Sequence, residues 1–209
     1  MAALRKQAEV VIKELQHLVE GADHPQREAA IRDLAALADG YAACLQAKAI
    51  GFPEFSRVVT PCGGGGLAAG LALALPDAEI TVAEPEGWDD MRRSLDAGWI
   101  EPVGDNPPPT ACDALQTKEV SNLTFDVLAR RGAQGVAVSE EETRDAQRWA
   151  ARNLRVVLEP GGAVALAALL AGKVAPEPGL LVILSGGNAD PDAYARVLAG
   201  EEQRELSHA

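Results

Sequence analysis

Apolar residues recur at two different spacings, and the change of spacing divides the chain. In the first quarter they fall three and four positions apart, which predicts two amphipathic helices with Leu15 and Ile31 on their apolar stripes. Beyond it, short β-branched runs alternate with helical stretches, a pattern typical of α/β proteins. We therefore expect a helical segment at 1–52, an α/β domain at 53–200 and a frayed tail at 201–209.

The α/β part alternates strands and helices, which implies a parallel sheet with right-handed crossovers. Strands are predicted at 56–61, 79–84, 135–138 and 180–184, and helices at 67–75, 88–97, 123–131, 139–154, 160–173 and from 190 onward. The last strand is apolar throughout, as in strands covered on both faces. The predicted fold is an open, mostly parallel sheet with helices on both faces, preceded by an N-terminal α-helical pair.

Composition and charge exclude some classes of function. The formal net charge is −12 and there is no basic stripe, so we expect no nucleic-acid partner. No apolar run approaches the roughly 20 residues that span a bilayer, so we expect no membrane partner. The charged N-terminus lacks the apolar core of a signal peptide, so a cytoplasmic location is expected.

Four consecutive glycines, Gly63, Gly64, Gly65 and Gly66, join the first strand to the helix that opens at Leu67. Glycine permits positive φ, which lets several N–H groups face one point, and the helix end adds a positive dipole. The loop is therefore predicted to hold a phosphate or another small anion. The alternative is a flexible turn, which would not require the folding entropy that four glycines cost.

Two further groups could carry chemistry. Ser185 follows the last strand in the segment Ser-Gly-Gly-Asn, at the sheet edge where the glycine loop is also expected. Its hydroxyl can bond a heteroaromatic nitrogen, although a serine in a loop often serves as a cap. Glu84 lies near Asp89 and Asp90, where carboxylates could hold a hard cation or simply favour the first helical turn.

A dinucleotide-binding domain is an alternative interpretation, because Glu84 follows the glycine loop at about the distance of a ribose-binding acid. The last glycine of that fingerprint is replaced by alanine here. The interpretation also leaves the segment around Ser185 without a role.

Five segments resemble, in the same order, the pyridoxal-phosphate-dependent serine and threonine dehydratases and the related serine racemases of fold type II. They are 59–70, 82–85, 111–115, 158–163 and 184–188, and the resemblance covers roughly 56–200. It implies that the glycine loop and Leu67 bind the phosphate of pyridoxal phosphate and that Ser185 bonds its pyridine nitrogen. It also implies a divalent cation such as Mg²⁺, held by Glu84, the Trp88 carbonyl and Asp90.

One departure from this family concerns catalysis. The family uses a lysine in an early Ser-x-Lys segment to form the Schiff base, and no such segment occurs in this sequence. We therefore expect a truncated, recombined or engineered relative of the dehydratases that is inactive alone and binds the cofactor weakly and noncovalently. A designed or structural scaffold without any ligand is the alternative. A homodimer, or a second chain that supplies the lysine, is left open.

Overall fold

A computed structural model of the protein describes residues 55–200. The helical pair expected at 1–52 and the frayed tail expected at 201–209 lie outside the described residues, so these predictions are untested. None of the helices within 55–200 is long and apolar enough to cross a membrane.

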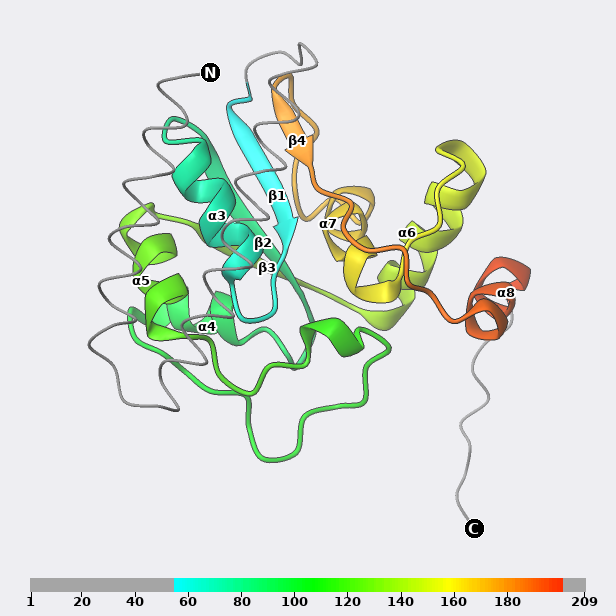
Figure 1. The fold of residues 1–209 in the computed structure, drawn as a ribbon, viewed down its shortest axis with the longest axis horizontal. Helices are drawn as coiled ribbons and strands as arrows, with labels where there is room; N and C mark the ends of the chain where they lie inside the picture. The colour runs from blue at the N-terminus through cyan, green and yellow to red at the C-terminus, as the bar shows by residue number, and fades with distance from the viewer. Residues whose placement is uncertain (1–54, 201–209) are drawn as a thin grey trace.

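A four-stranded parallel sheet forms the centre of the described part, as predicted (Figure 1). Its strand order is β3-β2-β1-β4, and every neighbouring pair is parallel. The strands are β1 (Arg57–Pro61), β2 (Glu79–Pro85), β3 (Gln134–Val138) and β4 (Leu180–Val182). Because β1 and β4 are parallel neighbours, the segments that follow them leave the sheet at the same edge.

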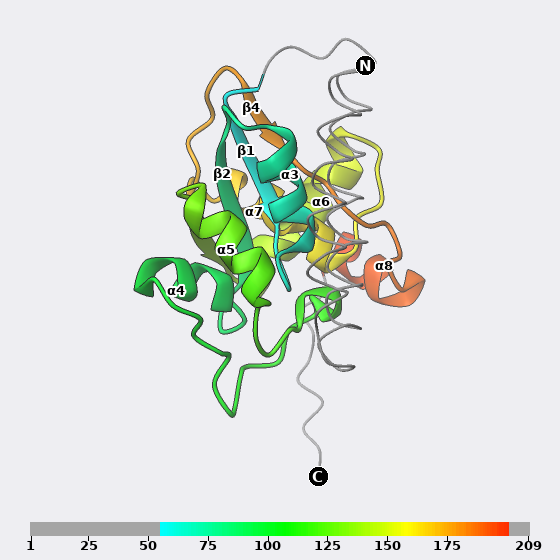
Figure 2. The same cartoon turned by 60° about the vertical axis from the view of Figure 1, so that its left-hand side comes forward.

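Helices cover both faces of this sheet (Figures 1 and 2). Alternate strand residues face opposite sides, so Val58 and Val82 enter one core cluster while Val59 and Ala83 enter the other. On the first face lie α3 (Gly66–Ala74), α4 (Asp90–Ala97) and α5 (Asn122–Arg130). On the second face lie α6 (Glu140–Asn153) and α7 (Pro160–Leu170), with α8 (Pro191–Ala199) beside α6.

The helix α7 is buried almost entirely, as its apolar composition predicts. Every residue from 161 to 168 is buried, and the helix packs against β1, β2 and β3 on one side and α6 on the other. Alanine and glycine dominate it, so neighbouring backbones can approach closely. This position also brings the start of α7 to the edge of the sheet where the glycine loop lies.

The last strand packs on both core clusters, in line with the prediction that it is covered on both faces: Leu181 and Ile183 pack against one, and Leu180, Val182 and Leu184 against the other. β4 has three residues and ends the strand order within 55–200, and residues 180–184 are half-buried. Its pairing with β1 extends slightly further, because the N–H of Ile183 donates to the Val59 carbonyl oxygen at 2.9 Å. An apolar run marks a strand that contacts a core but does not reveal how many strands flank it.

Polar caps fix two helix starts near the sheet. Ser139 forms the predicted capping box, in which its hydroxyl accepts from the N–H of Glu142 and the Glu142 carboxylate accepts from the N–H of Ser139. Ser121 caps α5 in the simpler way, by accepting the N–H of Thr124 at 3.2 Å. The second cap lies at the start of α5, where Thr124 contacts the glycine loop.

Candidate functional site

The glycine loop, Gly63 to Gly66, connects β1 to α3. Gly65 has φ +86° and precedes the first residue of α3, where it makes no side-chain cap. Apart from Gly65, whose N–H lies near the Cys62 sulfur, no N–H group from Gly63 to Ala68 donates to a protein acceptor within the described part of the chain. These donors at a helix N-terminus are suited to hold an anion.

Two side chains from the first face lie under the loop. The Thr124 hydroxyl donates to the Gly64 carbonyl oxygen at 2.7 Å. A Cβ atom at Gly65 would lie 2.6 Å from the terminal methyl of Met91 and 2.9 Å from the Thr124 Cβ. The loop is thus packed on its inner side, and its conformation depends on glycine at position 65.

A short 3₁₀ helix, η1 (Asp113–Leu115), lies in space between the glycine loop and the start of α7. Leu115 is buried, and a Cβ atom at Gly63 would lie 3.2 Å from its Cα. The same side chain reaches Gly161, where a Cβ atom would lie 3.2 Å from the Leu115 Cγ. Leu115 therefore fills the space between these two parts of the site.

The segment 185–188, called here the Ser185 loop, packs on the start of α7. A Cβ atom at Gly162 would overlap the carbonyl oxygen of Ser185, so only glycine permits this contact. The Ser185 side chain is half-buried and has no hydrogen-bond partner among the described residues. The two predicted binding elements therefore lie on one edge of the sheet, and the Ser185 hydroxyl is free to meet a ligand.

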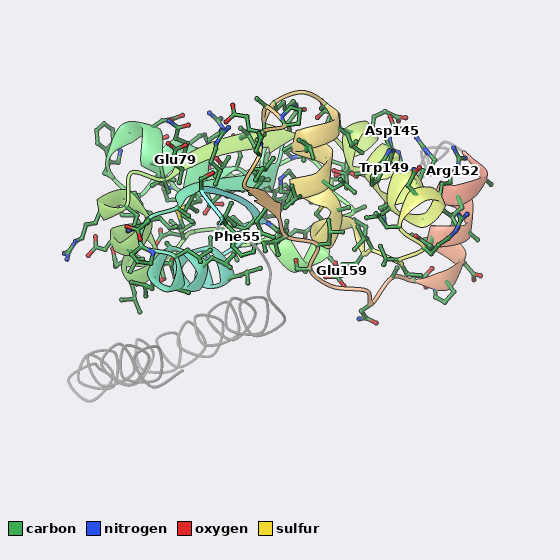
Figure 3. All side chains as sticks on the ribbon, turned by 90° about the horizontal axis from the view of Figure 1, so that it is seen from above. Phe55, Glu79, Asp145, Trp149, Arg152 and Glu159 are labelled. Carbon is green, nitrogen blue, oxygen red and sulfur yellow. The ribbon has the colours of Figure 1, made fainter. Side chains whose placement is uncertain are left out.

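Glu159, labelled in Figure 3, contacts the Ser185 loop through its carboxylate and its backbone. Its carboxylate accepts the N–H of Asn188 at 3.1 Å, and its own N–H donates to the Gly186 carbonyl oxygen at 3.3 Å. A cavity of about 220 Å³ opens beside these groups, with Asp113 and Arg144 also in its lining. Glu159 thus has the partner that sequence reasoning did not identify for it.

Glu84, at the end of β2, is completely buried and caps α4. Its two carboxylate oxygens accept the N–H groups of Met91 at 3.1 Å and Arg92 at 2.7 Å. Burial raises the pKa of Glu84 well above its usual value, while the Arg92 N–H opposes that shift and the Asp90 charge adds to it. Both oxygens are engaged by the protein, so this carboxylate is not free to bond a ribose.

Asp90 is also completely buried, and neither of its carboxylate oxygens has a hydrogen-bond partner among the described residues. Burial raises its pKa to about 6, and the shift is opposed by the charge of Arg93 and by the N–H groups of Asp90 and Val120, which lie near the carboxylate without forming a hydrogen bond to it. Burial and the charges of Glu84 and Asp90 raise the pKa of the nearby Cys62 thiol. The thiol therefore stays protonated at neutral pH.

The expected cation site gains no support from this geometry. Within 55–200, no group of three or more His, Cys, Asp or Glu residues could hold a metal ion. Of the three predicted ligands, Glu84 is engaged with α4, whereas the Asp90 carboxylate and the Trp88 carbonyl oxygen accept no hydrogen bond among the described residues. Asp89 forms ion pairs with Arg92 and Arg93 instead.

Sequence reasoning missed the residues that hold the loops in place. Thr124 and Leu115 contact the glycine loop from segments that are distant in sequence, and Thr124 belongs to none of the segments singled out in the sequence. Leu115 ends the segment 111–115, which was noted for its resemblance, but neither its contact with the loop nor a 3₁₀ helix was predicted. Only the fold reveals these contacts.

Comparison with known proteins identifies the family. A family model described as "Pyridoxal-phosphate dependent enzyme" matches residues 7–186, which is most of the chain. This chain belongs to the pyridoxal-phosphate-dependent enzymes. The match begins within the N-terminal segment that the sequence pattern set apart from the α/β domain. Membership in this family leaves the dinucleotide-binding interpretation without support.

Individual relatives agree with this family. The chain is 32% identical to serine racemase from Dictyostelium discoideum over 152 residues, which cover 69% of this chain and 47% of the racemase. It is 33% identical to L-threonine ammonia-lyase from Thermotoga maritima, with 70% of this chain and 37% of that enzyme covered. The chain therefore spans less than half the length of these two curated relatives.

Solved structures show the same fold. A threonine deaminase from T.th. superimposes with a TM-score of 0.68 at 36% identity, covering 77% of this chain and 60% of that one. Maize serine racemase gives a TM-score of 0.67 at 28% identity, covering 78% of this chain and 52% of the racemase. The parallel sheet of this chain therefore resembles that of the threonine deaminase and serine racemase structures.

Proposed function

We propose that this chain retains the phosphate-binding half of a serine/threonine dehydratase site and does not catalyse dehydration alone. The observation that supports this most is the row of unpartnered N–H groups between Gly63 and Ala68, at a helix start without a side-chain cap. The residues present fit the phosphate group of pyridoxal phosphate, because the loop offers donors and its Cβ-free positions leave room for an anion.

Different residues of the chain would bind different parts of the cofactor. The N–H groups of the glycine loop and Leu67 hold the phosphate, and the Ser185 hydroxyl meets the ring nitrogen. Glu159 keeps the Ser185 loop in place through the N–H of Asn188. When covalently bound to a lysine, the cofactor supplies an electron sink for cleavage next to the amino group of an amino acid.

The lysines support the lack of activity. The described part of the chain contains Lys118, which is exposed, and Lys173. The Lys173 Nζ donates to the Ala137 carbonyl oxygen at 2.8 Å and pairs with Glu142 at 2.6 Å. Ala137 belongs to β3, two strands away from the glycine loop on β1. Neither lysine has the segment that the family uses for its Schiff base.

Cofactor titration tests the proposal. Without an imine, binding of pyridoxal phosphate or inorganic phosphate is expected to be about millimolar, near −4 kcal/mol. The absorbance of added pyridoxal phosphate should remain that of the free aldehyde, and L-threonine should yield no ketoacid. Ketoacid production by the pure protein that disappears in Ser185→Ala would overturn the proposed inactivity.

Gly64→Val tests the location of the site. A Cβ atom at Gly64 would meet only the Thr117 methyl at 3.7 Å, so the variant should fold while its side chain crowds the loop. Gly104→Val, where a Cβ atom would meet nothing within 4 Å, is the matched control. Binding should be lost in the first variant and kept in the second. Equal affinity in both would place the anion elsewhere and make the loop an inherited turn.

A divalent cation at Glu84, Trp88 and Asp90 is part of the same proposal. The two oxygens of Asp90 have no hydrogen-bond partner among the described residues, whereas the complete engagement of Glu84 with α4 counts against the site. Binding would require Glu84 to share an oxygen with the ion. Calorimetry with Mg²⁺, Mn²⁺ and Ca²⁺ that shows neither heat nor a change in melting temperature would remove this part.

A further inference from the structure

Thr124 is a buried polar residue whose contacts converge on the glycine loop. Its side chain is completely buried on α5, and its Oγ1 donates to the Gly64 carbonyl oxygen at 2.7 Å. This bond joins residues 60 positions apart in the sequence. The hydroxyl also lies 3.1 Å from the Ser121 Oγ, which caps α5. The loop is therefore tied to the start of α5.

The bond fixes the direction of one peptide group. In a trans peptide the carbonyl and the following N–H point in opposite directions, so holding the Gly64 oxygen orients the Gly65 N–H away from Thr124. Gly65 then turns at φ +86° into α3, and a Cβ atom there would lie 2.9 Å from the Thr124 Oγ1. The orientation of this peptide thus sets the path by which the chain enters α3.

We infer that Thr124 is a positioning residue for the anion site, acting through the Gly64–Gly65 peptide. This inference rests on the proposed function of the glycine loop. The hydroxyl does not touch the ligand. It limits the loop to the conformation in which the N–H groups of Gly66 and Leu67 face outward, so less conformational entropy is lost when an anion binds.

Two substitutions separate the hydroxyl from the methyl group of Thr124. Thr124→Val keeps the volume and removes the donor, whereas Thr124→Ser keeps the donor. Thr143→Val is the matched control, because Thr143 is also buried and its hydroxyl donates to the Ser139 carbonyl oxygen at 2.9 Å, on α6. The measurements are the dissociation constant for inorganic phosphate and the amide hydrogen exchange of Ala69, whose N–H donates to the Gly65 carbonyl oxygen at 2.8 Å.

Thr124→Val should weaken phosphate binding ~tenfold, the equivalent of one ordinary hydrogen bond, and should speed exchange at Ala69. Thr124→Ser and Thr143→Val should bind and exchange like the parent protein. If Thr124→Val does not fold, Thr124→Ala replaces it, since it adds no volume.

The inference is overturned if Thr124→Val matches Thr143→Val in both measurements, or if serine does not restore them. A parent protein that binds no phosphate would remove the proposed function instead. Hydrogen exchange then decides alone whether Thr124 holds the loop, because that readout requires no ligand.

Discussion

Replacing Gly65 by alanine should destabilise the protein far more than the same change at Gly98. Both residues lie at helix ends with nearly equal backbone angles, φ +86° for Gly65 and φ +81° for Gly98. Alanine in this left-handed conformation costs about 1–2 kcal/mol at either position. At Gly98 a Cβ atom would meet nothing within 4 Å, so no further cost is expected there.

At Gly65 the packing adds a second cost. The new Cβ would lie 2.6 Å from the flexible end of Met91, which can move, and 2.9 Å from the Thr124 Cβ, which is held by the α5 backbone. Overpacking of this kind costs about 1–3 kcal/mol. The expected loss of unfolding free energy is therefore ~3 kcal/mol for Gly65→Ala and ~1 kcal/mol for Gly98→Ala.

Urea unfolding, followed by circular dichroism, measures the difference. With a slope of about 2 kcal/mol per molar urea, the midpoint of Gly65→Ala should lie about 1 M below that of Gly98→Ala. Equal midpoints for the two variants would refute the reasoning, because they would show that the loop is not packed against α5.

Three other changes give further predictions. Gly162→Ala should lower the free energy of unfolding by ~2 kcal/mol, because the new Cβ would overlap the Ser185 carbonyl oxygen. This loss exceeds the ~1 kcal/mol by which alanine is preferred to glycine within a helix. A variant that is more stable in urea would contradict this contact. Asp90→Asn, measured with EDTA, should stabilise the protein by roughly 1–3 kcal/mol at pH 8 and hardly at all near pH 4. The pKa of Asp90 is raised from 3.8 to about 6, so the stability that its protonated form contributes is complete below pH 3.8 and is lost as the pH rises through 6. If Asp90→Asn raises the melting temperature equally at all pH values, this explanation is rejected. Leu15→Asp should destabilise the whole domain if the N-terminal apolar stripes pack on it, whereas melting like the parent would show a detached segment.

Much of the fold could be predicted because its signals are local. The glycine loop, the capping box at Ser139 and the alternation of strands and helices each depend on residues close in sequence. The strand order β3-β2-β1-β4 could not be predicted, since it depends on which strands pair. Nor could the support of the glycine loop by Thr124, because the two bonded residues are 60 positions apart and nothing between them indicates that hydrogen bond.

The candidate site could likewise be predicted only in part. The glycine loop and Ser185 were predicted to lie on one edge because parallel strands end together, and the pairing of β1 with β4 confirms it. The interpretation of Glu84 differs from the structure because a carboxylate at the end of a strand can serve either a ligand or the next helix. The N–H groups of Met91 and Arg92, which decide between the two, are revealed only by the path of the chain.

The pairing of β1 with β4 also affects how the protein folds during synthesis. β1, β2 and β3 leave the ribosome in order and can associate early. The other side of β1 can pair with β4 only after residues 180–182 have been synthesised. Until then that side of β1 has no partner strand among the described residues, and an unpaired strand edge favours aggregation. Slow translation before residue 180 would lengthen this exposure, so the yield of native protein should depend on how quickly the last segment is made.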